Sequence, residues 1–307
     1  MITIPHKAKQ FAVFIIKLLI VSGAFYFIYN QLLHDDRLDW SKFVALLKEK
    51  QSVAGILFLL SFSVANRYLE ILKWQNLVSH IKPITVGEST KQVLGALTAG
   101  IFTPNGVGEY AGKALYFEKL KTKKVIFLNL ICNGIQMLLT IVFGTLGLFI
   151  LGYWQWALGV IGLLSFLLLG TYMTKGITIK GYSIGKLVQK INEIPRPVHY
   201  KNILYGVLRY LVFSHQYYFL FLAFGVDLPY GTMMASIASV YFLASSLPSF
   251  QFLDFAVKGS MAVFFFGRLG VNEWIVVFIA TLMWFLNVVL PVVIGSYFVL
   301  KFKPKWN

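Results

Sequence analysis

The sequence predicts an all-α polytopic membrane protein, built as a single integral membrane domain over residues 1–307. Three observations lead to this fold class. Hydrophobic residues make up 58% of the chain, charged residues make up only 13%, and the apolar residues arrive in long runs. Soluble globular proteins carry charge on about a quarter of their residues, and a soluble core cannot bury runs of this length. A water-soluble fold is therefore excluded.

The net charge of +16 reflects 28 Lys and Arg against 12 Asp and Glu. A basic chain can bind nucleic acid, but the cytoplasmic loops of membrane proteins also collect Lys and Arg. If the amino terminus lies in the cytoplasm, most basic residues fall at the cytoplasmic face, in segments such as 113–124 and 175–201. We therefore expect a multi-pass protein of the inner (cytoplasmic) membrane, with both termini in the cytoplasm and no nucleic-acid partner.

The membrane segments follow from the apolar runs. Residues 11–33 form the first span, which we expect to stay uncleaved because no small-residue cleavage site follows it. Residues 39–50 alternate charged and apolar positions at helical spacing, which is typical of a surface-lying helix. The later runs cover residues 53–78, 86–102, 124–151, 153–174, 202–224, 232–247, 250–267 and 274–300.

These runs predict about 8–10 membrane segments, although several are shorter than the roughly 20 residues that a crossing helix needs. Proline, glycine and charge interrupt the chain around Pro104 and Pro248, so we expect two broken or re-entrant helices there. The polar segment 175–201 is predicted to be a cytoplasmic loop, and 153–174 is predicted to be a linking span.

A sequence repeat suggests that the chain has two related halves, at residues 53–151 and 202–300. The triplet Arg67-Tyr68-Leu69 recurs as Arg209-Tyr210-Leu211, 142 positions later. Three further pairs keep the same order at offsets of 144 or 145, namely Pro104 with Pro248, Glu109 with Asp254, and Lys113 with Lys258. An odd number of membrane passes separates the copies, so the halves should be inverted, as they are in many alternating-access transporters.

The first helix break carries charged residues inside apolar surroundings. Pro104, Gly106 and Gly108 precede Glu109 and Lys113. Ionisable residues in a membrane are costly and often functional. Glu109 and Lys113 stand four positions apart, so they can also neutralise each other as a purely structural ion pair on one helix face. Both interpretations remain open from the sequence.

A second group of polar residues forms a stripe on the span 53–78. Arg67, Glu70, Lys73 and Trp74 stand three or four positions apart. The planar fork of an arginine suits phosphate oxygens, and Glu70 could hold the fork of Arg67 in place. For Lys73 and Trp74 the sequence favours an interfacial position, with a snorkelling base and an aromatic anchor. Arg209 is the matching arginine of the second half.

The remaining motifs give no support for a metal, a cofactor or a catalytic residue. The five histidines are scattered without metal-ligand spacing, and the single cysteine, Cys132, lies in an apolar run. His215 fits a hydrogen-bonded structural histidine better than a proton relay. No nucleophile elbow or phosphate-binding loop is present. We therefore favour a protein that is not an enzyme, although acid–base catalysis by Glu109 with Asp254 stays open.

These residues resemble a known family. Arg67 and Trp74, the stretch Pro104-x-Gly106-x-Gly108-Glu109 and the basic segment 119–124 are similar to the transmembrane-region family of lysylphosphatidylglycerol synthase, over about residues 10–300. Members fused to an aminoacyl-transferase domain move aminoacylated phosphatidylglycerol across the bilayer, and we expect a stand-alone member here. The second half departs from the family's glycine-rich pattern, because residues 247–254 read LPSFQFLD.

Together, the residues and the resemblance imply flippase-like translocation of an anionic or zwitterionic lipid, with aminoacylated and polyprenyl-phosphate lipids as options. The alternative is a membrane-embedded transferase or accessory subunit that acts on a lipid phosphate. Expected partners are the membrane lipid and either a second copy of the chain or a lipid-modifying enzyme. The expected substrate-binding residues are Arg67, Glu70, Pro104, Gly108, Glu109, Lys113, Arg209, Asp254 and Lys258.

Overall fold

The computed structural model describes residues 53–101, 103, 106–178, 183–247 and 253–303, together with residues 15, 19, 22 and 26. Of these residues 84% are helical and none lies in a strand, which confirms the all-α fold class. Most of the predicted first span, the predicted surface helix at 39–50, and both Pro104 and Pro248 lie outside the described residues.

The helices coincide closely with the apolar runs of the sequence. In chain order they are α3 (Val53–Val78), α4 (Val86–Gly100), α5 (Val107–Ala114), a 3-10 turn (Lys119–Lys121), α6 (Thr122–Ile150), α7 (Trp154–Met173), α8 (Ile184–Asn192), α9 (Arg196–Ala223), α10 (Tyr230–Ser246), α11 (Asp254–Arg268), α12 (Glu273–Trp284), the π-helical segment η3 (Phe285–Val289) and α13 (Leu290–Lys301).

Local sequence signals explain several helix ends. Thr85 and Glu88 form a capping box at the start of α4, in which each side chain binds the backbone N–H of the other residue. The helices α6 and α9 end just before Gly152 and Gly225, whose φ angles of 84° and 76° favour glycine. These signals set where each helix begins or ends.

The predicted cytoplasmic loop 175–201 is partly helical. It contains α8, and α9 begins at Arg196 rather than at residue 202. Pro195 precedes the helix and Pro197 lies in its first turn, where a missing N–H does no harm and the fixed φ of proline suits a helix start. The apolar run therefore marked only the later, less polar part of α9.

Four helices in the described part of the chain are long and apolar enough to cross a membrane: Val53–Val78, Lys119–Ile150, Trp154–Met173 and Glu273–Lys301. The helices α4, α5, α10 and α11 have only 15, 8, 17 and 15 residues. A helix of about 20 residues is needed to cross the hydrocarbon core. Four candidate spans agree with a membrane protein. In the described part of the chain they are fewer than the about 8–10 membrane segments expected from the sequence.

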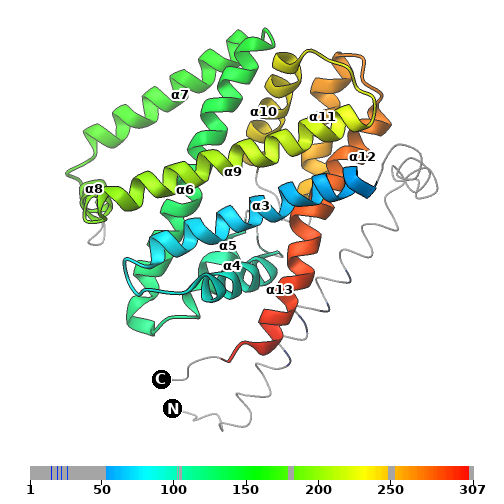
Figure 1. Cartoon of the computed structure of the whole chain (residues 1–307). Helices are drawn as coiled ribbons and strands as arrows, with labels where there is room; N and C mark the ends of the chain where they lie inside the picture. The colour runs from blue at the N-terminus through cyan, green and yellow to red at the C-terminus, as the bar shows by residue number, and fades with distance from the viewer. Residues whose placement is uncertain are drawn as a thin grey trace.

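Helices distant in sequence pack side by side. The helix α3 lies along α9, α6 packs on α10, and α13 packs on α4 (Figure 1). Small residues permit two of these contacts. A Cβ on Gly147 of α6 would meet the carbonyl oxygen of Ala235, and a Cβ on Gly295 of α13 would overlap that of Leu94. Close backbone approach at glycine is a common way for membrane helices to associate.

The helix α7 differs from the others because its side chains are almost entirely exposed. Ala157 is its one buried residue. Its mostly apolar side chains and its position at the edge of the bundle fit a lipid-facing span (Figure 1).

Candidate functional site

A cavity of about 540 Å³ lies where α3, α4, α5, α6, α9, α10, α11, α12 and η3 meet. Its lining combines charged side chains with apolar ones such as Leu97, Met137 and Phe213. Six of the expected site residues line it together: Arg67, Glu70, Glu109, Arg209, Asp254 and Lys258. The structure therefore gathers residues from both halves of the predicted repeat around one cavity.

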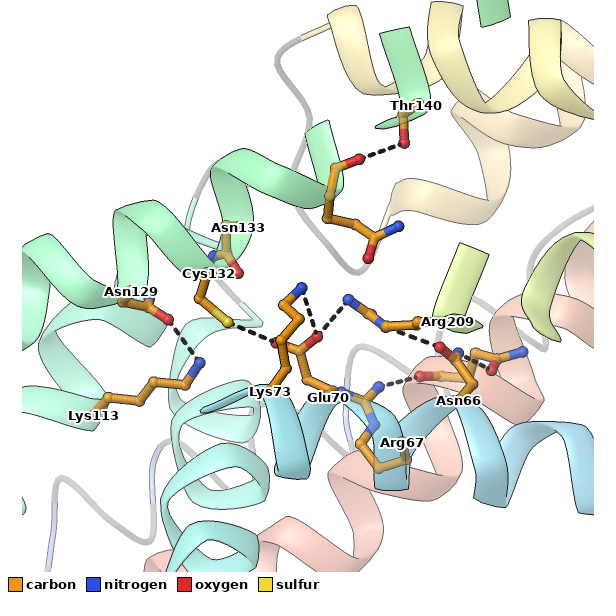
Figure 2. A network of polar contacts seen from close by, with 12 residues as sticks. Asn66, Arg67, Glu70, Lys73, Lys113, Asn129, Cys132, Asn133, Thr140 and Arg209 are labelled. Atoms are coloured by element: carbon orange, nitrogen blue, oxygen red, sulfur yellow. Dashed lines mark hydrogen bonds and ion pairs between the residues drawn. The ribbon is translucent and has the colours of Figure 1, made fainter. Parts of the chain in front are cut away.

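Glu70 and Arg209 form an ion pair between α3 and α9 at this cavity. Arg209 Nη1 lies 2.5 Å from Glu70 Oε2, and Arg209 Nε donates a hydrogen bond of 2.9 Å to Asn66 Oδ1 (Figure 2). Asn66 and Glu70 are one turn apart on α3, so together they accept from two edges of one guanidinium. The expectation that Glu70 would hold Arg67 is wrong, because Glu70 faces α9.

Arg67 instead contacts the π-helical segment. Its Nη2 donates a hydrogen bond of 2.7 Å to the backbone carbonyl of Asn287. A π-helical turn interrupts the regular i to i+4 pattern, and such segments often occur at functional sites. Arg67 Nε is buried and has no hydrogen-bond partner in the described part of the protein.

The Asn287 side chain connects three helical elements. Asn66 Nδ2 donates to Asn287 Oδ1 at 2.7 Å, and Asn287 Nδ2 donates to Gln216 Oε1 at 2.9 Å. Gln216 Nε2 in turn donates to Ser63 Oγ and to the carbonyl of Leu59. Buried amides need such partners. Sequence reasoning missed Asn287, and the only signal for it was a single amide within the apolar run 274–300.

Lys73 and Trp74 are not at an interface, and the interfacial interpretation of the sequence is wrong for both. Each is 0% exposed. Lys73 Nζ lies 3.5 Å from Glu70 Oε2, and Trp74 Nε1 donates to Gln92 Oε1 at 2.8 Å. The physical reason is that α4 and α6 pack over this end of α3, so its polar stripe faces protein.

Lys113 does not line the cavity, although its partner in the sequence pattern, Glu109, does. Lys113 is 0% exposed and donates a hydrogen bond of 2.7 Å to Asn129 Oδ1 on α6 (Figure 2). Its Nζ also lies 4.6 Å from the centre of the Trp74 ring, a cation–π contact. Lys113 therefore stands behind the cavity wall.

Gly108 has a packing role in the described residues. Its N–H donates to Thr103 Oγ1 at 2.7 Å, and a Cβ at this position would lie 2.9 Å from Gly100 Cα. The small residue lets the start of α5 approach the end of α4 closely. This approach places Glu109, the next residue, at the cavity. The other expected residue of this break, Pro104, lies outside the described residues.

Asp254 and Lys258 of α11 also line the cavity and form an ion pair. Lys258 Nζ lies 2.5 Å from Asp254 Oδ2, one turn earlier on α11. The same Nζ stands 5.0 Å from the centre of the Tyr241 ring. Both ionic side chains keep about a quarter of their surface exposed, which is consistent with a position facing the cavity.

Several buried polar groups at the cavity wall bind nothing within the described protein. Both amide atoms of Gln136 and the hydroxyl of Tyr217 lack a hydrogen-bond partner. Buried polar groups are normally satisfied, so these atoms are available to a bound polar ligand. His215 is different, because its two ring nitrogens contact the Leu211 carbonyl and the Tyr230 hydroxyl. It is a hydrogen-bonded structural residue.

No family model matches this chain, and no curated protein matches its sequence. The site is therefore interpreted from the chemistry of its own residues. Within the described residues no cluster of three or more His, Cys, Asp or Glu side chains could hold a metal ion. What the arrangement offers is a mixed cavity, with two arginines, carboxylates and an apolar wall, which suits a molecule with a charged head and an apolar tail.

Proposed function

We propose that the protein translocates an anionic or zwitterionic lipid across the cytoplasmic membrane, as a flippase does. The observation that carries this proposal is that Arg67 and Arg209, the matching arginines of the two halves, line one cavity together with apolar side chains. Guanidinium groups bind phosphate oxygens through paired hydrogen bonds. The apolar lining can accommodate the first part of a lipid tail.

The proposal includes an inverted repeat, in which α3 corresponds to α9, α4 to α10, α5 to α11, and α6 to the run from α12 to α13. Reciprocal packing supports it. The helices α3 and α9 pack on each other, α6 packs on α10, and α13 packs on α4. A two-fold relation exchanges the last two contacts with each other. Binding between inverted halves is the arrangement that alternating access uses.

Re-entrant helices also belong to the proposal. The short helices α4 and α5 pack on each other on either side of the predicted break. At a rise of 1.5 Å per residue, α5 extends only about 12 Å. Such short pieces are tolerated at membrane depth where they line a cavity, and Gly106 and Glu109 do line one. The proposal also places both termini in the cytoplasm and takes the chain as a stand-alone relative of the lysylphosphatidylglycerol synthase transmembrane family that its sequence resembles.

Translocation can be tested with the purified protein in liposomes that carry fluorescent lipids. Movement is measured as the fraction of label that a membrane-impermeant reductant reaches over time. We expect Arg67→Gln and Arg209→Gln to abolish movement, and Arg268→Gln to leave it unchanged, because Arg268 is exposed and packs on Phe264 away from the cavity. Failure of the wild type to move any phospholipid or polyprenyl-phosphate lipid would overturn the proposal.

A membrane-embedded transferase or accessory subunit is the second candidate, because the carboxylates Glu109 and Asp254 line the same cavity. A carboxylate can act as a general base. In a transferase, Glu109→Gln and Asp254→Asn should abolish product formation while lipid binding persists. A flippase should instead form no new product with any lipid phosphate.

A further inference from the structure

The charged side chains around the cavity have a net positive charge. Within the described residues, the positive groups are Arg67, Lys73, Lys113, Arg209 and Lys258, and the carboxylates are Glu70, Glu109 and Asp254. Asp254 and Lys258 neutralise each other as a close pair. Four cations and two carboxylates then remain on α3, α5 and α9. This region therefore carries a surplus of two positive charges.

Solvent cannot screen this surplus charge effectively, because two of the cations that contribute to it are completely buried lysines. Lys73 and Lys113 are both 0% exposed. Lys73 Nζ makes no hydrogen bond in the described part of the structure, and its nearest carboxylate, Glu70, is shared with Arg209 (Figure 2). Lys113 is held by a neutral amide and an aromatic ring. Both positive charges therefore act on the cavity through a medium that screens little.

An uncompensated charge inside a protein is costly, and a bound partner of opposite charge removes that cost. A phosphate monoester carries about two negative charges at neutral pH, whereas a phosphodiester carries one. A zwitterionic headgroup would leave the surplus unchanged. Arg67 adds a buried Nε that has no partner in the described residues and can serve a phosphate oxygen.

From this surplus, and resting on the proposed translocation, we propose that the site selects a lipid whose headgroup is a phosphate monoester or a diphosphate, in preference to a phosphodiester lipid. The two arginines at the cavity contact the phosphate directly. Lys73 and Lys113 are positioning residues, which strengthen binding from behind the wall through their charge. The apolar lining, which includes Leu97, Met137 and Trp284, selects a lipid over free phosphate.

The direct test uses two ligands that differ in a single charge. Farnesyl phosphate and its methyl ester have the same tail, and the ester has one negative charge fewer. Calorimetry on the full chain in detergent at pH 8 should give a dissociation constant at least about tenfold lower for the monoester, as expected for one extra charge near buried cations. Equal affinities would overturn the inference. Inorganic phosphate should bind more weakly than either, and binding as tight as that of farnesyl phosphate would overturn the choice of a lipid.

Two variants test the origin of the preference. Lys73→Gln and Lys113→Gln should each lower the ratio of the two affinities by about threefold or more, with a smaller change for the methyl ester, because the ester has one charge fewer to interact with each lysine. Lys190→Gln on the exposed α8 is the matched control and should keep the ratio. An unchanged ratio in both buried variants would contradict the inference. If a variant does not fold, the wild-type comparison still decides.

These measurements separate the inference from the proposed function. If both farnesyl ligands bind equally and Arg67→Gln removes binding of both, the preference is wrong and the lipid site stands. If neither ligand nor any phospholipid binds, and no lipid moves in liposomes, the proposed function fails together with the inference.

Discussion

Arg209 of α9 binds Glu70 of α3 at 2.5 Å, across 139 positions of the chain. The Glu70 side chain is only 6% exposed, and it also lies near Lys73. This carboxylate therefore joins the two long helices that carry the matching arginine triplets. A buried carboxylate with two basic neighbours is a point at which removal of one group leaves other charges without a partner.

Glu70→Gln should destabilise the fold strongly. Removing one member of a buried ion pair typically costs about 3–5 kcal/mol, because the remaining charge stays buried. Here both Arg209 and Lys73 lose their carboxylate. Reversible unfolding in mixed micelles measures the loss. Glu118→Gln is the control, since Glu118 pairs with Lys121 at the surface, where pairs are worth about 0–1 kcal/mol. Equal losses in both variants would contradict this role of Glu70.

Leucine at Gly147 or Gly295 should also destabilise the bundle. A side chain at Gly147 meets the carbonyl oxygen of Ala235, and one at Gly295 overlaps Thr98 and the carbonyl of Leu94. Overpacking of this kind costs about 1–3 kcal/mol or more. The same unfolding measurement applies. Gly162→Leu on the exposed α7 is the matched control, because nothing lies within 4 Å of a Cβ there. A loss at Gly162 as large as at Gly295 would show that glycine replacement itself is responsible.

Asn287→Leu should weaken the contact among α3, α9 and η3 without removing the bond of Arg67, which uses the backbone carbonyl of Asn287. The change leaves Asn66 and Gln216 each without one amide partner. Unsatisfied buried amides cost about 1–3 kcal/mol each. Unfolding free energies check this, with Thr171→Val at an exposed position of α7 as control. A loss below that of the control would show that these amides find other partners.

Much of the fold could be predicted from the sequence because helix length and hydropathy are local properties. The run 53–78 is the same as α3, and the runs at 124–151 and 153–174 match α6 and α7 within two residues. The start of α9 was missed, because its first turns are too polar for an apolar run. The packing of helices on one another could not be predicted either, because no local pattern in the sequence indicates that α6 contacts α10.

For the site, too, local features could be predicted from the sequence, whereas contacts between distant residues could not. The sequence selected Arg67, Glu70, Glu109, Arg209, Asp254 and Lys258, because charge inside an apolar run is rare, and all six line the cavity. It misplaced Lys73 because the local sequence around a lysine near a helix end is the same whether the side chain faces solvent or another helix. It missed Asn287, whose importance depends on a π-helical turn that brings its carbonyl to Arg67.

The interaction of Lys73 with Glu70 can be tested with a double-mutant cycle between Glu70→Gln and Lys73→Gln. The Lys73 ammonium lies 3.5 Å from the Glu70 carboxylate, with both groups buried. Residues in direct contact show coupling energies of about 0.5–3 kcal/mol, so the double variant should be less destabilised than the sum of the single ones. Unfolding free energies of the four proteins give the coupling. A value near zero would mean that Lys73 makes no net electrostatic interaction inside the protein, which would contradict its role in the preference for a dianionic headgroup.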